Sequence, residues 1–503
     1  MKMKNLRLFV AIMVVFFLTI IGVNYMVFAS NYDEIIIAQP CEPETMDISA
    51  QSLQETQNVL LNMVEPLLEA KGDGEFSPCL AASWEYISDK EIKFHLRRGV
   101  VFHNGDPFTA KDVKFSFDFY QNPTNKSPLM GKLTAFKGLE IIDDHTIIIS
   151  TKELYAPALA ILAQYLNIMP ERFIETKGRE EYAKHGIGTG PYELSQWVRG
   201  QYVEVKAFDR YWGEKPEIKK VTFKTIPEVT SRVSALLVGE ADIINEVPFE
   251  KWTDVKKTET TKLVNSYWLE YYIGLNIFEK PFDDVKVRQA LNYAIDRQLI
   301  IDSLLKGEGK AQASAICPRT FGYDPNVEVY EYNPNKAKEL LAEAGYPNGF
   351  ETELSYPNNY INIQQISEAI ASYLSQVGVK VTLNPNEPAI EWQKYRDKEL
   401  HMYIYRWDDD PEPDKYIYPL LHSQARGYYY KNLLVDTLID KARSIVNREE
   451  REKAYHYLCK VVHDDAPWVF LWVHPTKFGV SNDVDWQPSR LGYTKMKYAK
   501  FIK

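Results

Sequence analysis

The chain has 503 residues, a formal net charge of -10 and a pI near 5.6, with 45% hydrophobic and 25% charged residues. This composition excludes collagen-like, coiled-coil and largely disordered proteins, and the length allows several packed domains. Lysine and arginine are scattered rather than clustered, so this acidic chain is not expected to bind nucleic acid. Aromatic residues are abundant at 13%, with 33 Tyr and 10 Trp among them.

The first 29 residues are typical of a secretory signal peptide. Three basic residues within the first seven precede an apolar run over residues 8–23, and residues 27–29 fit a small-residue cleavage site. An uncleaved anchor is the alternative, because an apolar stretch of about 20 residues can span a bilayer. The first cysteine, Cys41, does not lie in a lipoprotein-like box. We therefore expect export to the periplasm or the cell surface, without an N-terminal lipid.

Short strands and capped helices alternate along the rest of the chain. Strand patterns cover residues 34–39 and 91–97, and a hairpin is expected over residues 192–208. Apolar residues at helical spacing predict a helix over residues 54–68. Three further helices begin at capping signals, at Thr109 with Asp112, at Asp283 with Asp284, and at Asn333 with Pro334. The predicted class is α/β or α+β, in several closely packed domains.

Four cysteines remain after the signal segment, namely Cys41, Cys79, Cys317 and Cys459. In an oxidising compartment they could form two disulfides with three possible connectivities, of which Cys41–Cys79 is the first expected pair. Buried free thiols are the alternative. The spacing of the four cysteines matches no zinc site.

Common catalytic motifs are absent from the sequence, including the P-loop, HExxH and GxSxG patterns. Residues 186–191 (GIGTGP) resemble a phosphate-binding loop, but a strand-like stretch follows instead of a helix, so a structural turn is predicted. The histidines are dispersed, and surface or core positions are favoured over a metal site for His401, His422, His456, His463 and His474. We expect neither an enzyme nor a bound cofactor or metal ion.

The sharpest local feature is an acidic segment that follows a strand-like stretch over residues 401–406. Residues 407–414 (WDDDPEPD) hold five carboxylates within seven residues. An EF-hand is excluded because Pro413 stands where that loop needs its glycine. A solvated acidic loop is the default interpretation. The alternative is a loop shaped by its two prolines, holding one carboxylate beside Trp407 as a receptor for an ammonium group.

Together these segments resemble the extracellular solute-binding proteins of ABC importers, in the oligopeptide/dipeptide/nickel class known as family 5. The matching segments occur in the family's order and cover nearly the whole mature chain. They are residues 94–116 (FHLRRGVVFHNGDPFTAKDVKFS), 188–213, 237–242 (LVGEAD), 275–300 (LNIFEKPFDDVKVRQALNYAIDRQLI), 332–345 and 407–413. The first and fourth of these segments are family-wide markers and look like determinants of the fold.

The resemblance implies an α/β fold with two lobes that close on a ligand like a hinged trap, and an extra subdomain in the first lobe. Lobe I would comprise residues 30–64, 187–275 and 474–503, the extra subdomain residues 65–186, and lobe II residues 276–473. Closure would bury the ligand and form the surface presented to the membrane permease and, through it, to the ATPase subunits. The protein is expected to act as a monomer.

In peptide-binding members of the family, a carboxylate three residues after the tryptophan receives the peptide's α-ammonium group. By position this carboxylate is Asp410, although the loop is one residue shorter here and Asp408 and Asp409 are also acidic. The same resemblance implies that the ligand site includes the residues around this loop, Tyr405, Arg406 and Trp407, and a stretch of the cleft wall, Glu44 and Thr45.

The resemblance implies peptides as the ligands, and the backbone of a peptide would pair with exposed strand edges whatever its side chains. An oligosaccharide is the main alternative, and a nickel or other metal chelate is a further one. Stacking of sugar rings would suit the aromatic residues Trp268, Tyr271, Tyr272, Tyr403, Tyr405, Tyr428, Tyr429 and Tyr430, for which core packing is the competing interpretation. The remaining alternative is a different class of protein, a secreted interaction protein or receptor-linked sensor, which would have no transport role.

Overall fold

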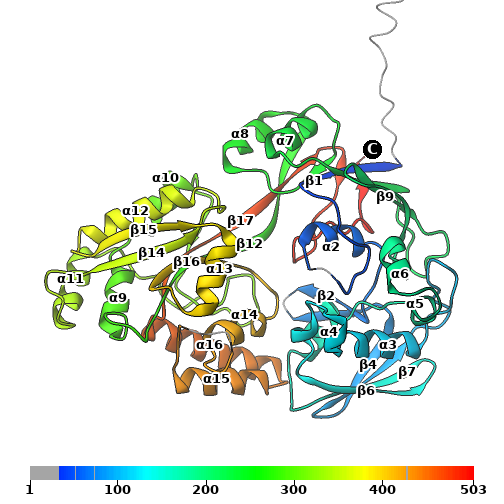
Figure 1. Cartoon of the computed structure of the whole chain (residues 1–503), viewed down its shortest axis with the longest axis horizontal. Helices are drawn as coiled ribbons and strands as arrows, with labels where there is room; N and C mark the ends of the chain where they lie inside the picture. The colour runs from blue at the N-terminus through cyan, green and yellow to red at the C-terminus, as the bar shows by residue number, and fades with distance from the viewer. Residues whose placement is uncertain (1–32, 51, 73, 426–428, 503) are drawn as a thin grey trace, which may run out of the picture.

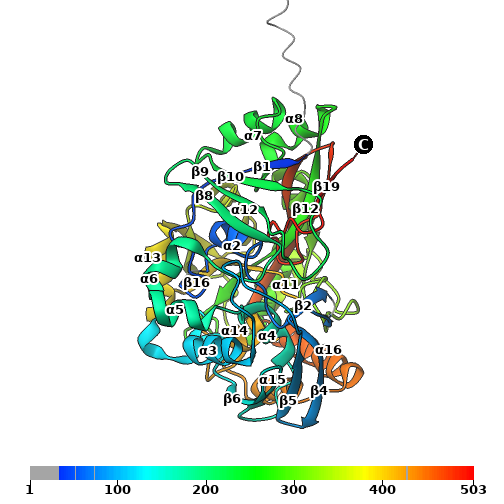
Figure 2. The same cartoon turned by 90° about the vertical axis from the view of Figure 1, so that its right-hand side faces the viewer.

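The computed structural model describes residues 33–50, 52–72, 74–425 and 429–502, so the predicted signal peptide lies outside the described residues. The molecule has two halves (Figure 1), and the long strands β12 (Thr261–Leu275) and β17 (Trp468–Ser481) run between them. Both views place α7 and α8 at one end of the molecule and β4 and β6 at the other (Figure 1; Figure 2). Among the described residues, no helix combines the length and apolar character needed to cross a bilayer.

One mixed sheet connects the two halves, because β12 and β17 pair antiparallel from Thr261 opposite Ser481 to Gly274 opposite Trp468. β12 ends at the predicted lobe boundary after residue 275, whereas β17 continues across the predicted boundary at residue 473. The strand order is β15 (Lys380–Asn386), β14 (Glu351–Pro357), β16 (Met402–Asp408), β12, β17, β11 (Ile243–Ile244), β1 (Glu34–Gln39), β10 (Lys220–Thr225), β9 (Tyr202–Ala207) and β8 (Tyr192–Val198), and β13 (Lys310–Ala311) also pairs with β17.

In the half that contains lobe II, helices surround β14, β15 and β16 (Figure 1). As predicted, Pro334 is the first residue of α11 and the Asn333 side chain accepts a hydrogen bond from the Lys336 backbone N–H at 3.0 Å. The helices of this half are α9 (Val285–Tyr293), α10 (Arg297–Leu304), α11 (Pro334–Glu343), α12 (Ile363–Ser375), α13 (Pro388–Asp397), α14 (Asp414–Leu421), α15 (Leu433–Arg443) and α16 (Arg448–Asp465).

In the other half, the segments predicted to form lobe I and the extra subdomain share one continuous core. Ile35 and Ile37 on β1 belong to the same buried cluster as Ile147 and Ile149 in the subdomain. Its helices are α2 (Gln54–Leu60), α3 (Ala110–Gln121), α4 (Ala158–Tyr165), α5 (Glu171–Lys177) and α6 (Arg179–His185), with α7 (Val229–Leu237) and α8 (Trp252–Lys257) beyond them and 3-10 turns at Pro123–Asn125, Met130–Lys132 and Phe249–Lys251.

The subdomain has an antiparallel sheet of its own, in which the predicted strand over residues 91–97 is β5. The capping box predicted at the start of the adjacent helix α3 is confirmed, because the Thr109 backbone N–H donates to Asp112 at 2.8 Å. The sheet order is β4 (Ala81–Ser88), β5 (Glu91–Leu96), β7 (Thr146–Thr151) and β6 (Phe136–Asp143), and shorter pairs are formed by β2 (Leu68–Gly72) with β3 (Glu75–Pro78) and by β18 (Val484–Asp485) with β19 (Lys500–Phe501).

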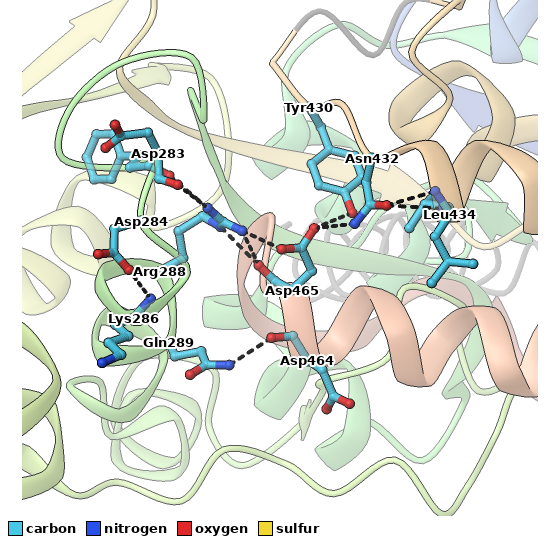
Figure 3. Close-up of polar contacts among 12 residues, drawn as sticks. Asp283, Asp284, Lys286, Arg288, Gln289, Tyr430, Asn432, Leu434, Asp464 and Asp465 are labelled. Carbon is cyan, nitrogen blue, oxygen red and sulfur yellow. Dashed lines mark hydrogen bonds and ion pairs between the residues drawn. The ribbon is translucent and has the colours of Figure 1, made fainter. Parts of the chain in front are cut away.

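The segment over residues 275–300 contains a buried arginine, Arg288, that connects two helices. Arg288 on α9 donates to the carboxylate of Asp465 at 2.5 Å and to its backbone carbonyl, and therefore ties α9 to the end of α16 (Figure 3). The other carboxylate oxygen of Asp465 accepts hydrogen bonds from Tyr430 at 2.7 Å and Asn432 at 2.9 Å. The guanidinium also caps the carbonyl of Phe282, so these contacts of the marker segment are structural.

The segment around α2 is shorter than its periodicity predicts. The helix expected over residues 54–68 ends at Leu60, where the Asn62 side chain donates to the carbonyls of Asn58 and Thr494 and turns the chain away. The turn predicted over residues 186–191, which packs against this segment, is confirmed. The Gly190 N–H donates to the Met63 carbonyl at 2.9 Å, and a Cβ on Gly188 would lie 2.1 Å from that oxygen, so glycine is needed for this close approach.

The expected disulfide between Cys41 and Cys79 is not formed, and all four cysteines are free thiols. Cys41 is exposed in the loop after β1 near Glu55, whereas Cys79 is buried near Glu65. Burial raises the pKa of the Cys79 thiol well above its ordinary value. Cys317 and Cys459 are also buried, as the alternative of apolar packing predicts.

Candidate functional site

The acidic segment forms a shaped loop between β16 and α14. The Asp409 backbone N–H donates to the Trp268 carbonyl at 2.9 Å, and the Asp409 side chain accepts from the Trp268 N–H at 2.7 Å, which fixes the start of the loop to β12. The Asp410 carboxylate then accepts from the Glu412 N–H at 2.9 Å, and the Asp410 carbonyl accepts from the Thr320 hydroxyl at 2.7 Å. Hydrogen bonds to side chains and backbone therefore define its conformation from end to end.

Most carboxylates of this loop are buried and paired with a cation, so the default interpretation of a solvated acidic loop is wrong. A buried carboxylate keeps its charge only with a close partner. The pairs, with their N–O distances, are Asp409 with Arg490 (2.6 Å) and Arg319 (3.5 Å), Glu412 with Arg451 (2.6 Å), and Asp414 with Arg443 (2.8 Å).

Asp410 is paired within the protein by Lys415, on the first turn of α14. The Lys415 ammonium donates to the Asp410 carboxylate and to the side-chain carbonyl of Gln164, and it lies 4.8 Å from the centre of the Tyr165 ring. Gln164 and Tyr165 belong to α4 of the extra subdomain, so this ion pair lies where the two halves meet. Burial lowers the pKa of Lys415, but the nearby carboxylate of Asp410 and the phenol of Tyr165 together outweigh this effect, so the pKa of Lys415 is raised.

Asp408 differs from the other carboxylates of the loop. It is the last residue of β16, its side chain is exposed, and among the described residues its carboxylate has no hydrogen-bond or ion-pair partner. Protein atoms nevertheless surround the group. The resulting desolvation raises the pKa of Asp408 to about 6; the Arg406 guanidinium opposes this shift, and Glu246 adds to it.

These groups line a hollow between the two halves with a volume of about 360 Å³, open to solvent, which we name the loop hollow. Its wall combines the acidic loop with side chains from α4, β12 and the C-terminal segment. The lining residues are Lys132, Gln164, Tyr165, Tyr267, Arg406, Trp407, Asp408, Asp409, Asp410, Lys415, Leu491 and Tyr493. Anions, cations and aromatic rings thus face the same space, as in sites that fix the charged ends of a small polar ligand.

A second, much smaller hollow of about 90 Å³ also borders Asp410, and its wall is more apolar. Gln164, Asp410, Leu491 and Tyr493 border both hollows. Its remaining wall includes Leu61, Pro66, Ala70, Phe76, Ala160 and Ala163. Apolar walls of this kind would accept an apolar part of a ligand whose charged end lies in the loop hollow.

The residues expected at the ligand site divide into two groups. Arg406, Trp407 and Asp410 line the loop hollow. Tyr405 does not line it and packs against Tyr395, with ring centres 5.2 Å apart. The stretch of Glu44 and Thr45 lies apart from this hollow, with the Glu44 carbonyl accepting from Arg199 at 3.3 Å and the Thr45 hydroxyl accepting from the Asp47 N–H at 3.0 Å.

The residues of the loop hollow that lie in other segments of the chain were not predicted from the sequence. Gln164 and Tyr165 end a short helix with no distinctive motif, and Tyr493 lies about 80 residues beyond the acidic loop. Among these residues, only Lys415 could have been noticed from the sequence as a partner for the acidic loop. It stands five residues after Asp410 and is the first basic residue beyond a run of carboxylates.

Most of the aromatic residues considered for sugar stacking are in the core. Tyr271, Tyr272, Tyr403, Tyr429 and Tyr430 are buried, which confirms the core-packing interpretation for them. Trp268 and Tyr405 are half-buried, and Tyr428 lies outside the described residues. In the part of the chain that the structure describes, no group of three or more His, Cys, Asp or Glu residues is arranged to hold a metal ion.

Known proteins are similar to this chain over most of its length. The model of bacterial extracellular solute-binding proteins, family 5 (middle region), matches residues 75–428. A heme-binding protein A from Haemophilus influenzae is 33% identical over 444 residues, which cover 79% of each chain. The chain belongs to family 5 of the extracellular solute-binding proteins. Members of this family are the solute-binding components of ABC importers, as the resemblance implied.

A second relative of this family 5 protein is named for another ligand, and solved structures share its fold. A glutathione-binding protein GsiB from Pectobacterium atrosepticum is 30% identical over 433 residues, covering 83% of this chain and 84% of the relative. The structure of HbpA2 from Haemophilus parasuis matches with a TM-score of 0.85 and 26% identity, over 93% of this chain and 100% of that one. DppA from Helicobacter pylori, in complex with the peptide STSA, matches with a TM-score of 0.79 and 27% identity, over 93% and 98%. The two-lobed α/β fold is therefore confirmed.

Proposed function

We propose that this family 5 protein is an exported, unlipidated and monomeric component of an ABC importer that captures short peptides between its lobes and delivers them to the permease. It binds its ligand without chemical change, so it is not an enzyme. The observation that carries this proposal is the loop hollow, in which carboxylates, cations and aromatic rings from both halves face one space. A peptide is zwitterionic and offers matching groups at its two ends.

The choice of peptide draws on the relatives as well as on the hollow. DppA was solved with a bound peptide, and GsiB is named for glutathione, which is itself a tripeptide. A heme ligand is suggested by the name of the Haemophilus influenzae relative. Among the described residues that line the two hollows there is no His, Cys or Met, the side chains that most often hold heme iron. Peptide therefore remains our primary ligand, with heme included in the test.

Capture and release require the contacts between the halves to form and break. The Tyr155 hydroxyl donates to Asp414 at 2.9 Å, and the Ala156 N–H donates to the Arg443 carbonyl at 2.7 Å, beside the pair of Lys415 with Gln164. These contacts join the extra subdomain to α14 and α15 and hold the halves together. A ligand that touches both walls of the hollow would add to them and favour the closed form that the permease recognises.

A thermal-shift screen of the purified protein tests the ligand class. Di- to hexapeptides, oligosaccharides, a nickel–histidine complex and hemin are compared at equal concentration. A ligand present at 100 times its dissociation constant adds about 2.7 kcal/mol of stability and raises the melting temperature. We expect peptides to raise it and the other ligands to leave it unchanged. A shift with oligosaccharide or hemin, and none with any peptide, would contradict the proposal.

A further inference from the structure

The place where a peptide's ammonium group would bind at Asp410 is already filled by the protein itself. The Lys415 ammonium has Asp410 and Gln164 as hydrogen-bond partners and the face of Tyr165 beside it. Both members of the pair are buried, with side-chain exposures of 7% for Lys415 and 9% for Asp410. A primary ammonium in this position satisfies the carboxylate as fully as the ammonium of a ligand would.

Replacing Lys415 by a ligand would therefore bring little gain. The ligand would form one ammonium–carboxylate contact at the expense of an equivalent one. If Lys415 stayed, two ammonium groups would share one carboxylate, and like charges at close range repel each other. Asp410 is for these reasons a poor receptor for a second cation.

Asp409 is no better placed, because Arg490 and Arg319 already compensate its charge. Asp408 is the carboxylate of the loop that faces the hollow without such a partner among the described residues. The Tyr267 ring and Trp407 line the same space and provide aromatic surface next to an incoming cation. The carboxylate of the loop hollow that has no salt-bridge partner in the described part of the chain is thus located two residues before the position that the family resemblance indicates, although Arg406 and Lys415 act on it at longer range.

We propose that Asp408, and not Asp410, receives the ammonium group of the ligand, while Lys415 remains as a built-in occupant of Asp410. This inference rests on the proposed binding of peptides in the loop hollow. Lys415 then acts as a specificity residue, because it moves the amine end of the ligand toward β16. The ligands selected are those whose free amine reaches Asp408 without entering the space between α4 and α14.

Two variants distinguish the two carboxylates by titration calorimetry, with trialanine and the tightest-binding peptide of the screen as probes. Asp408→Asn removes the proposed receptor and should weaken binding by about 10- to 100-fold. The double variant Asp410→Asn/Lys415→Met removes the built-in pair as a neutral unit and should weaken binding clearly less than Asp408→Asn does. Asp209→Asn, at an exposed carboxylate outside the hollow, is the matched control. Thermal melting verifies that each variant is folded.

The opposite pattern would overturn the inference. If the double variant loses peptide binding while Asp408→Asn keeps it, Lys415 is displaced by the ligand and Asp410 is the receptor. Equal losses in both variants would also contradict an exclusive role for Asp408. Failure of the wild-type protein to bind any peptide of the screen would instead refute the proposed function, and the inference with it. Failure of the inference and failure of the proposed function are therefore distinguishable.

Discussion

The ammonium group of Lys415 donates a hydrogen bond to the carboxylate of Asp410, and the pair joins the start of α14 to the loop that follows β16. Gln164 of α4 contacts both members, at 3.4 Å in the case of Asp410. A charge pair made by the protein thus lies at the junction of the two halves, within the wall of the loop hollow. The proposed ligand chemistry and the contacts between the two halves both involve this pair.

Removing only one member of the pair should lower the unfolding free energy more than removing both members. Lys415→Met leaves a buried carboxylate without its cation, for which a loss of about 3–5 kcal/mol in unfolding free energy is expected. Asp410→Asn/Lys415→Met removes both charges and should recover at least half of that loss. Urea denaturation measures both values. A double variant no more stable than Lys415→Met would show that charge compensation is not the reason for the pair.

The neighbouring pair of Glu412 and Arg451 should be a stability determinant of lobe II. The guanidinium donates to both carboxylate oxygens, at 2.9 and 2.6 Å, and the side-chain exposures are 9% for Arg451 and 7% for Glu412. Glu412→Gln leaves the buried guanidinium uncompensated and should lower the unfolding free energy by about 3 kcal/mol. Glu153→Gln is the control, since Glu153 is 85% exposed in its pair with Lys90 and such pairs contribute about 0–1 kcal/mol. Similar losses in the two variants, in chemical denaturation, would argue against this role.

The glycine turn that resembles a phosphate loop should tolerate no side chain at its tightest point. Gly188→Ala would place a Cβ against the backbone of Met63 and Val64, which cannot move aside as a flexible side chain can. We expect a loss of about 1–3 kcal/mol or more from overpacking. Gly138→Ala is the matched control, because a Cβ there meets no atom within 4 Å. The comparison is made by thermal melting, and equal melting temperatures would contradict the packing argument.

Peptide affinity should depend on pH through Asp408. Desolvation raises the pKa of Asp408 to about 6 in the absence of ligand. The ionised carboxylate receives the ammonium group, so affinity should be constant between about pH 6.5 and about 7.5, where the peptide amine is still charged. Below about pH 6 affinity should fall, by up to about tenfold per pH unit, because binding then has to remove a proton. Calorimetric titrations at several pH values measure this, and Asp408→Asn should abolish the dependence. An unchanged affinity at about pH 5 would contradict the assignment.

Elements specified by neighbouring residues could be predicted from the sequence. The capping side chains Thr109 and Asn333 act within three residues of themselves, and the helices begin where those signals lie. The helix after Gln54 was predicted too long because its end is set by Asn62, whose partner Thr494 is more than 400 residues away. Local periodicity contains no trace of such a contact.

The candidate site shows the same limit. Residues 407–414 stand out by composition, but apart from Lys415 the cations that compensate them come from distant positions, among them Arg490 and Arg451. Sequence alone therefore identified the loop without showing which carboxylate keeps its charge uncompensated. Asp408 is distinguished only by the absence of a partner among the described residues, which is a property of the folded chain.

The most direct test of the account is the affinity for one peptide with and without a free amine. The tightest-binding peptide of the screen and its N-acetylated form are titrated into the wild-type protein by calorimetry at about pH 7. The account predicts that acetylation weakens binding by at least about tenfold, because the neutral amide cannot form a charge-assisted contact with the acidic loop. Equal affinity for the two forms would contradict recognition of an ammonium group in the loop hollow.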